Sequence, residues 1–260
     1  MTPAIQIQNL CFGYEENEVL HNINLEVARQ DFAIIVGPNG GGKTTLLRLM
    51  LGLLEPRYGS VKILGKRPVC ARRQMAYVPQ SLQFDPKFPI SVLETVLLGR
   101  VERHLFGGPR AADRKIALDA LQEVGLADCA RRPYAALSGG QRQRVLIAQA
   151  LASEPEVLLL DEPGANLDTP GVATIYGLLK ELSRRLTIIM VSHNLSMVES
   201  FATHVICVNH TADMHQISEV SQEDLHAGNW VHIFHHSCPV SHDEGEDLCA
   251  GPHLGKEETR

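Results

Sequence analysis

The sequence predicts an α/β fold in which a mainly parallel β-sheet is covered by helices and accompanied by a small antiparallel sheet and an inserted helical segment. Three observations support this prediction. Short, almost continuous apolar runs are typical of parallel strands that are buried on both faces. Segments that alternate apolar and polar residues indicate half-buried antiparallel strands. A stretch in the middle of the chain has the apolar periodicity of helices.

The expected strands fall into two groups. The antiparallel group consists of residues 5–10 (IQIQNL), 23–27 (INLEV) and 61–64 (VKIL). The parallel group consists of residues 32–36 (FAIIV), 157–160 (VLLL) and 187–191 (TIIMV). Each parallel strand is followed by polar or glycine residues, and parallel α/β sheets bind their ligands at these carboxyl ends.

The helical insertion lies between about residues 91 and 152. Two sets of apolar residues recur there at helical spacing: Val92, Leu93, Val96 and Leu97, and then Ile116, Leu118, Leu121 and Val124. After about Val220 the apolar periodicity fades, and His, Cys, Asp and Glu accumulate. We therefore expect a core with the antiparallel subdomain (1–90 and 153–220), a helical subdomain (91–152) and a C-terminal tail (221–260).

Composition and charge exclude several classes of protein. Hydrophobic residues make up 44% of the 260 residues, which is enough for a folded core and excludes a disordered chain. The formal net charge of -6 argues against nucleic acid as a partner, because sequence-independent binding needs a basic surface. No apolar run approaches the roughly 20 residues that span a bilayer, and the N-terminus lacks a basic segment before an apolar one. We expect the chain to stay in the cytoplasm.

A glycine-rich loop follows the first parallel strand. Residues 37–44 (GPNGGGKT) match the P-loop pattern GxxxxGK[ST] and precede a helical stretch at 46–50 (LLRLM), which is the context that the motif requires. The glycines let backbone N–H groups turn toward a phosphate, Lys43 places a positive charge on its oxygens, and the Thr44 hydroxyl can coordinate Mg²⁺. The predicted nucleotide-binding residues are Gly37, Pro38, Asn39, Gly40, Gly41, Gly42, Lys43, Thr44 and Thr45.

Two acids follow the strand at 157–160. Asp161 is placed to hold Mg²⁺, and Glu162 extends beyond it toward the γ-phosphate of a bound ATP. A carboxylate in that position can act as a general base and polarise the attacking water. An acid pair after a buried strand, in a chain that also has a P-loop, favours an ATP-hydrolysing site over two solvated acids.

A second phosphate-binding helix start lies at residues 137–144 (LSGGQRQR). Its serine is expected to cap the helix, and its two glycines to present backbone N–H groups to a phosphate. The Lys43 loop already holds the phosphates of one nucleotide, so the second helix start predicts a γ-phosphate held by another subunit. The residues assigned to it are Ser138, Gly139, Gly140 and Gln141.

With LSGGQRQR about twenty residues before the strand that ends in the acid pair, the chain resembles ATP-binding cassette (ABC) ATPases over roughly residues 1 to 210. The resemblance implies a P-loop NTPase core that hydrolyses ATP with Mg²⁺ held by Thr44, Gln80 and Asp161. It implies that Tyr14 stacks on adenine, with a core tyrosine as the alternative reading. It also implies a catalytic set made of Glu162, His193 and Gln80.

The same resemblance implies partners. Two copies of the chain would close around two ATP molecules, each bound by the P-loop of one copy and by the Ser138 helix start of the other. The segment 163–168 (PGANLD) is similar to the loop through which such copies touch, although many relatives differ at Gly164 and Asn166. This difference bears on coupling between the two copies rather than on hydrolysis, because Asp168 is in place.

An integral-membrane permease is the second implied partner, which places the chain on the cytoplasmic face of the cell membrane. An extracytoplasmic substrate-binding protein would take part indirectly. The candidates for permease contact are Phe84, Phe88, Pro89 and Ile90. A place in the core of the helical subdomain is the equal alternative for these four residues.

The cargo is suggested by the segment 77–100, which resembles that of divalent-metal importers for zinc, manganese or iron, with iron-chelate importers as the nearest alternative. The tail carries imidazole and thiol groups that suit zinc: His232, His235, His236, Cys238, His242, Cys249 and His253. Without a CxxC or HxxxH pattern, this tail is either a metal sensor or a solvated polar segment. Two further alternatives are a soluble, non-transport ABC ATPase and a nucleotide-gated metal-regulatory protein.

Overall fold

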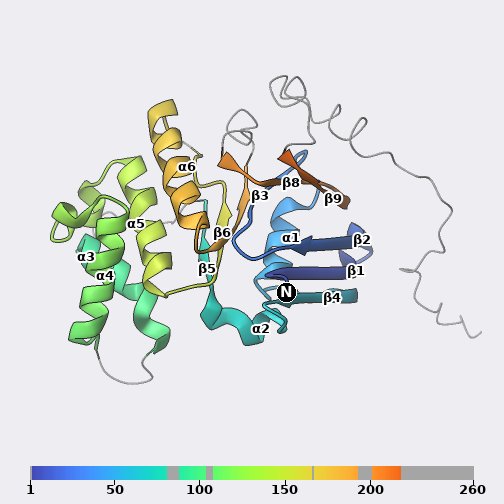
Figure 1. Ribbon diagram of the computed structural model, residues 1–260, viewed down its shortest axis with the longest axis horizontal. Coiled ribbons are helices and arrows are strands. Elements are labelled where there is room, and N and C mark those ends of the chain that lie inside the picture. The colour runs from blue at the N-terminus through green and yellow to red at the C-terminus, as the bar shows by residue number, and fades with distance from the viewer. Residues whose placement is uncertain (1, 81–87, 104–107, 166, 193–200, 218–260) are drawn as a thin grey trace, which may run out of the picture.

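The computed structural model describes residues 2–80, 88–103, 108–165, 167–192 and 201–217 (Figure 1). The strands are β1 Ile5–Tyr14, β2 Asn17–Val27, β3 Phe32–Val36, β4 Tyr58–Ile63, β5 Met75–Val78, β6 Val157–Asp161, β7 Thr187–Val191, β8 His204–Asn209 and β9 Thr211–Gln216. The α-helices are α1 Lys43–Met50, α2 Pro68–Ala71, α3 Val92–Leu97, α4 Ala111–Glu123, α5 Gly139–Ala152 and α6 Thr169–Ser183. Short 3-10 helices in the described residues include η1 Arg72–Gln74, η2 Leu98–Arg103, η3 Ala127–Cys129 and η4 Tyr134–Ala136. Within these ranges no helix combines the length and the apolar character needed to cross a membrane.

The larger sheet has the strand order β5-β6-β7-β3-β8-β9. All neighbours in it are parallel except β8 and β9, which pair antiparallel. The three predicted parallel strands are confirmed as β6, β7 and β3 in the centre of the sheet. Sequence analysis missed β5, β8 and β9. β5 was missed because it is an edge strand of only four residues. β9 was missed because it has too few apolar residues to show an alternating pattern.

The smaller sheet has the order β2-β1-β4 with antiparallel pairing, as predicted. β1 and β2 are longer than predicted, and their pairing runs from Ile5 opposite Val27 to Tyr14 opposite Asn17. The predicted strand at 61–64 is shifted, because β4 begins at Tyr58 and ends at Ile63. Leu64 has a φ of 52°, a left-handed conformation that interrupts an extended strand.

Two hydrophobic cores lie on opposite faces of the larger sheet. One packs Phe32, Ile34 and other residues of one strand face against α3, α4, α5 and α6. The other packs Ala33 and Ile35 against α1 and the smaller sheet, so that α1 lies between the two sheets (Figure 1). Because neighbouring residues of a strand point to opposite faces, a strand between two cores must be apolar throughout. The prediction of strands covered on both faces is confirmed.

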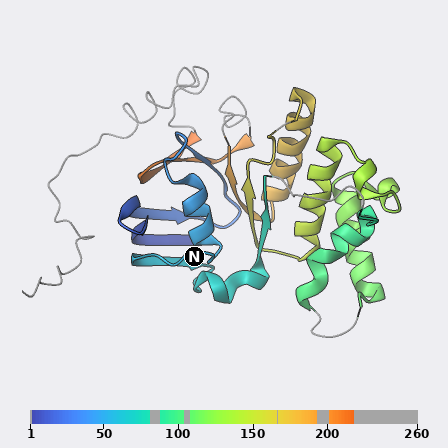
Figure 2. The ribbon, with the colours of Figure 1, turned by 180° about the vertical axis from the view of Figure 1, so that it is seen from behind.

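Helices α3, α4 and α5 form a bundle beside the core, within the predicted helical insertion (Figure 2). α3 begins with a capping box between Ser91 and Glu94. The helical spacing predicted for Ile116, Leu118 and Leu121 is confirmed by α4, in which Leu118 is 40% exposed. The buried residues of α4 are Asp113, Ala117, Ala120 and Leu121. The division at residues 90, 152 and 220 remains a proposal, and the tail at 221–260 lies outside the described residues.

A buried arginine joins three segments of the helical bundle. Arg100, which is 8% exposed, donates through Nε to Oδ1 of Asp113 at 3.0 Å and through a guanidinium N–H to Oε2 of Glu154 at 2.7 Å. It also donates to the carbonyl oxygen of Ala152 at 2.9 Å. Asp113 is 2% exposed. Removal of the arginine would therefore leave a buried carboxylate without its main counter-charge.

We expect Arg100→Ala to lower the free energy of unfolding by about 3–5 kcal/mol, the usual cost of breaking one side of a buried ion pair. Urea unfolding followed by circular dichroism measures this change. Arg184→Ala is the matched control, because Arg184 pairs with Glu181 on the surface and should cost less than about 1 kcal/mol. Equal losses in the two variants would contradict the structural role given to Arg100.

Candidate functional site

The loop at residues 37–42 joins β3 to the N-terminus of α1. A Cβ atom at Gly37 would lie 2.0 Å from the carbonyl oxygen of Val208, so only glycine fits there. Gly42, with a φ of 98°, is the N-cap residue of α1, and no side chain caps the helix. The first turn of α1 therefore presents backbone N–H groups to which an anion can bind. This is the arrangement that the P-loop pattern predicts.

Lys43 lies at the mouth of this loop. The residue is 7% exposed, and its Nζ donates to the carbonyl oxygens of Gly37 at 3.0 Å and Pro38 at 2.7 Å. Burial lowers the pKa of Lys43, and the nearby charges of Glu162 and Asp161 oppose that shift. The ammonium group is thus held over the loop beside two carboxylates, where it can accept a phosphate as a further partner.

The acid pair lies at the end of β6, as the sequence predicts. Glu162 has a φ of 47°, and its backbone N–H donates to the carbonyl oxygen of Val191 at 3.0 Å. Nε2 of Gln80, just after β5, donates to Oε2 of Glu162 at 3.0 Å. The structure thus brings together two predicted catalytic residues from neighbouring strands, 82 positions apart in the chain.

Asp161 has a neighbour that sequence analysis did not identify. Tyr77, on β5 opposite Leu159, lies close enough to Asp161 for the two side chains to interact electrostatically. Burial and the negative charge of Asp161 raise the pKa of Tyr77, and the charge of Arg48 on α1 opposes this shift. The only sequence signal is a polar group between two apolar residues of a short strand. The proximity of Tyr77 to Asp161 cannot be inferred before β5 is known to pair with β6.

The second predicted phosphate site is the N-terminus of α5. Ser138 is the N-cap residue, and its Oγ accepts a hydrogen bond from the backbone N–H of Gln141 at 3.3 Å. In return, Oε1 of Gln141 accepts from the backbone N–H of Ser138 at 3.1 Å. The predicted serine cap is therefore confirmed. Gly139 is exposed, so the start of this helix is open to a ligand.

A hollow of about 410 Å³ lies between this helix start and the N-terminus of α6. Its lining includes the start of α5 and residues of the predicted subunit-contact loop: Ser138, Gly139, Gly140, Gln141, Leu167 and Asp168. Asp168 caps α6, because its Oδ1 accepts from the backbone N–H of Gly171 at 3.2 Å. Residues of the P-loop do not line this hollow. The two predicted phosphate sites therefore lie at different places in one chain.

The remaining predicted site residues are less constrained by the structure. Tyr14, at the end of β1, is 43% exposed and stacks edge-to-face on Phe12, with ring centroids 5.0 Å apart. It is therefore not a core tyrosine. Thr44 is exposed, and Thr45 is 9% exposed. His193, Asn166 and the seven tail residues predicted to suit zinc lie outside the described residues.

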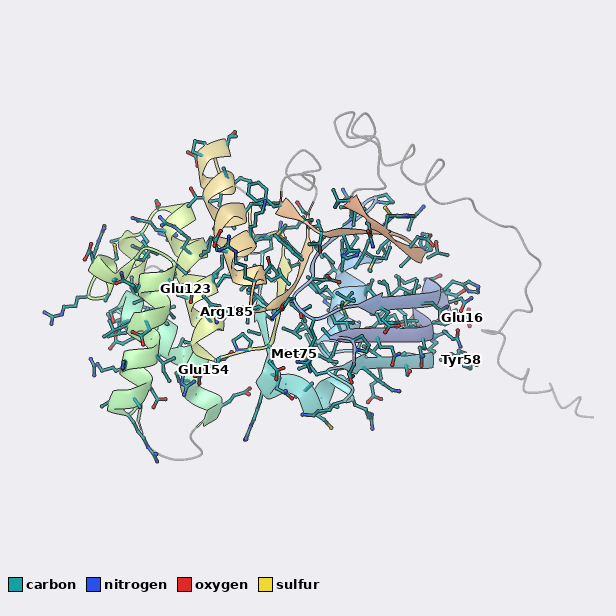
Figure 3. The ribbon with its side chains drawn as sticks, in the orientation of Figure 1. Glu16, Tyr58, Met75, Glu123, Glu154 and Arg185 are labelled. Atoms are coloured by element: carbon teal, nitrogen blue, oxygen red, sulfur yellow. The ribbon has the colours of Figure 1, made fainter. Side chains whose placement is uncertain are left out.

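A groove of about 370 Å³ separates β5 from the helical subdomain, and sequence analysis did not predict it. Its lining includes Met75, Tyr77, Leu98, Glu102 and Gln149. Arg185, just after α6, pairs with Glu123 at the end of α4 at 2.6 Å and so joins α6 to the helical bundle (Figure 3). Among the proposed permease contacts, Phe88 is 59% exposed, whereas Ile90 packs against the helical core and Phe84 lies outside the described residues.

Comparison with known proteins identifies relatives of this chain. A family model described as ABC transporter matches residues 20–165. A probable metal transport system ATP-binding protein of Chlamydia pneumoniae is 42% identical over 81% of this chain and 88% of its own length. A manganese transport system ATP-binding protein of Halalkalibacterium halodurans is 40% identical, with coverage of 80% and 84%. A zinc import ATP-binding protein of Pseudomonas fluorescens is 36% identical, with coverage of 97% and 94%.

Two solved structures are also similar. An inward-facing metal-chelate type ABC transporter has a TM-score of 0.77 and 32% identity, with coverage of 87% of this chain and 88% of the other. A dimeric bacterial ABC transporter cassette has a TM-score of 0.70 and 29% identity, with coverage of 82% and 98%. The loop, acid pair and second helix start all lie within residues 20–165, which the family model matches. The chain therefore belongs to the ABC transporter family, among its ATP-hydrolysing subunits.

Proposed function

We propose that the chain is the ATP-hydrolysing subunit of a membrane importer for a divalent metal ion, zinc or manganese. One observation carries the proposal. The N-termini of α1 and α5 both have the features of a phosphate-binding site, yet they lie apart in one chain (Figure 1). Such a chain can fill its second site only with a nucleotide held by another copy. Relatives named for metal, manganese and zinc transport support the choice of cargo.

In the proposed dimer, each ATP lies between the P-loop of one copy and the Ser138 helix start of the other. The solved dimer of a related cassette supports the pairing of two copies. Lys43 would bind the phosphate oxygens, and the open N–H groups at the start of α5 would bind the γ-phosphate from the opposite side. Tyr14, exposed at the end of β1, would stack on the adenine ring.

The oxygen atoms available beside the P-loop fit a magnesium ion. Thr44 offers an exposed hydroxyl, Asp161 a half-buried carboxylate and Gln80 an exposed amide oxygen, and Mg²⁺ prefers oxygen ligands. When bound, Mg²⁺ neutralises negative charge on the phosphate oxygens. Glu162 would take the proton of the attacking water as general base. His193 is proposed to contact the γ-phosphate.

The hydrogen bond between Gln80 and Glu162 connects this chemistry to the helical subdomain. Gln80 stands at the start of the segment that leads from β5 into α3. A shift of that segment would move the amide group away from the general base. We propose that the permease docks in the neighbouring groove, where Leu98 is 51% exposed beside charged Glu102. Docking there would place the chain on the cytoplasmic face of the membrane, with a substrate-binding protein on the other face.

The test is to purify the full chain with its membrane subunits, reconstitute the complex in vesicles and supply its substrate-binding protein. We expect Zn²⁺ or Mn²⁺ to stimulate ATP hydrolysis and to accumulate inside the vesicles as radioactive isotope. A complex carrying Glu162→Gln is the control and should accumulate no metal. Stimulation by a ferric chelate alone would replace the proposed cargo with the iron-chelate alternative. Full hydrolysis that no metal and no membrane subunit affects would favour a non-transport ATPase.

A further inference from the structure

A buried tyrosine of α6 reaches the end of β7. Tyr176 is 2% exposed, and its hydroxyl group shares a hydrogen bond of 2.7 Å with Oγ of Ser192, which is 5% exposed. Ser192 directly follows Val191, the last residue of β7. The backbone N–H of Ser192 donates to the carbonyl oxygen of Ile35 on β3 at 3.1 Å. The carboxyl end of β7 is therefore held by its neighbouring strand and also by a side chain of α6.

The same end of β7 holds the backbone of the proposed general base. The carbonyl oxygen of Val191 accepts a hydrogen bond from the backbone N–H of Glu162 at 3.0 Å. The ring of Tyr176 also lies beside Gly164, because a Cβ atom at Gly164 would be 3.8 Å from Cε2 of the tyrosine. Tyr176 therefore borders two backbone segments next to Glu162. One is the strand end that accepts the Glu162 N–H, and the other is the loop two residues further along the chain.

The backbone of Glu162 needs support from its surroundings, because its φ is 47°. This left-handed conformation is unfavourable for a residue with a side chain, and it persists where surrounding contacts hold it. In this conformation the Glu162 carboxylate accepts the hydrogen bond from Nε2 of Gln80. A relaxation of the Glu162 backbone would move the carboxylate out of that position.

The contact between Tyr176 and Ser192 is a hydrogen bond, although apolar packing could also fill this space. Replacing both partners of a buried hydrogen bond with apolar groups of the same shape can be nearly neutral for stability. A hydrogen bond, however, fixes the distance and direction between its two partners. We propose that Tyr176 is a positioning residue, through which α6 holds the end of β7 and thereby keeps the Glu162 carboxylate in the orientation for general-base catalysis. This inference rests on the proposed function, in which Glu162 is the general base.

The test measures ATP hydrolysis by the full chain with Tyr176→Phe, which removes the hydroxyl group and keeps the ring. We expect kcat to fall about 10-fold or more with an unchanged KM for ATP, because a small misplacement of a catalytic group can lower the rate up to about 100-fold. Ser192→Ala removes the other half of the hydrogen bond and should lower kcat by the same factor. The double variant should be no slower than either single variant, because both changes break one interaction.

Thr187→Val is the matched control for the loss of a buried hydrogen bond. Thr187 is 3% exposed at the opposite end of β7, and its Oγ1 accepts a hydrogen bond from the backbone N–H of Gln30 at 3.0 Å. This variant should lose stability in urea unfolding and keep the wild-type kcat. A loss of kcat equal to that of Tyr176→Phe would assign the effect to stability alone and overturn the proposal.

Glu162→Gln separates positioning from the general-base role itself. If Tyr176 acts through Glu162, Tyr176→Phe should cause no further loss of rate in the Glu162→Gln background. A wild-type kcat in both Tyr176→Phe and Ser192→Ala, or a further loss in the Glu162→Gln background, would overturn the positioning role. Wild-type hydrolysis by Glu162→Gln alone would instead overturn the proposed role of Glu162. A thermal unfolding midpoint shows whether each variant is folded, and Ser192→Ala tests the same hydrogen bond if Tyr176→Phe is not.

Discussion

Replacing Glu162 with Gln should lower the rate of ATP hydrolysis by about 100-fold or more while ATP still binds, since general-base catalysis contributes about 10²- to 10⁴-fold. The amide has the shape of the carboxylate, and its oxygen can still accept the hydrogen bond from Gln80 Nε2. It cannot take a proton from water. Because ATP stays intact, the variant should accumulate as an ATP-bound dimer.

Single-turnover hydrolysis measures the chemical step, and size-exclusion chromatography with ATP measures the dimer. Glu181→Gln, at an exposed acid of α6 that pairs with Arg184, is the matched control and should behave as wild type. A Glu162→Gln chain that hydrolyses ATP at the wild-type rate would remove Glu162 from the mechanism. A chain that binds ATP but stays monomeric would remove the dimer.

Replacing Lys43 with Ala should lower affinity for ATP about 10- to 100-fold, because hydrogen bonds that involve a charged group contribute about 1.5–3 kcal/mol. Lys43 is the cation that the fold holds over the P-loop, with its Nζ on the carbonyl oxygens of Gly37 and Pro38. Fluorescent ATP binding gives the affinity. Lys62→Ala, at an exposed position of β4, should leave affinity unchanged. Equal affinities for wild type and Lys43→Ala would exclude the P-loop as the phosphate site.

The sequence predicted the parts of the fold that depend on local pattern. The central strands β3, β6 and β7 were recognised because burial on both faces demands continuous apolar runs. The cap at Ser138 was recognised because serine is a preferred N-cap residue at the start of an apolar helix; the reciprocal contact with Gln141 was not predicted. The exposure of Leu118 could not be predicted, because spacing alone does not tell which side of α4 faces the bundle. β5 was missed because four residues on a sheet edge give no period to detect.

Contacts between distant residues could not be predicted at all. The Gln80–Glu162 hydrogen bond and the proximity of Tyr77 to Asp161 both depend on the pairing of β5 with β6, which no local pattern encodes. Predicting the groove beside β5 would likewise require the relative placement of a strand and a helical bundle. Motif residues could be assigned from the sequence because each motif is a short local segment whose chemistry follows from its residue types.

The claim that each ATP site is shared by two copies can be tested by combining Lys43→Ala with a second variant, Gly139→Asp. A Cβ at Gly139 would meet only Cδ2 of Leu167, at 3.5 Å, so the fold tolerates a side chain there. The carboxylate, however, would repel a γ-phosphate at the start of α5. In a dimer of Lys43→Ala or of Gly139→Asp chains, every site contains one damaged half. In a mixed dimer, one site contains both damaged halves and the other contains none.

The decisive measurement is therefore the ATP hydrolysis rate of an equal mixture of Lys43→Ala and Gly139→Asp chains, compared with each variant alone. Sites shared between copies predict that the mixture recovers up to about a quarter of the wild-type rate, because about half of randomly formed dimers are mixed and each has one intact site of two. A mixture whose rate stays at the mean of the two separate variants would contradict the shared site.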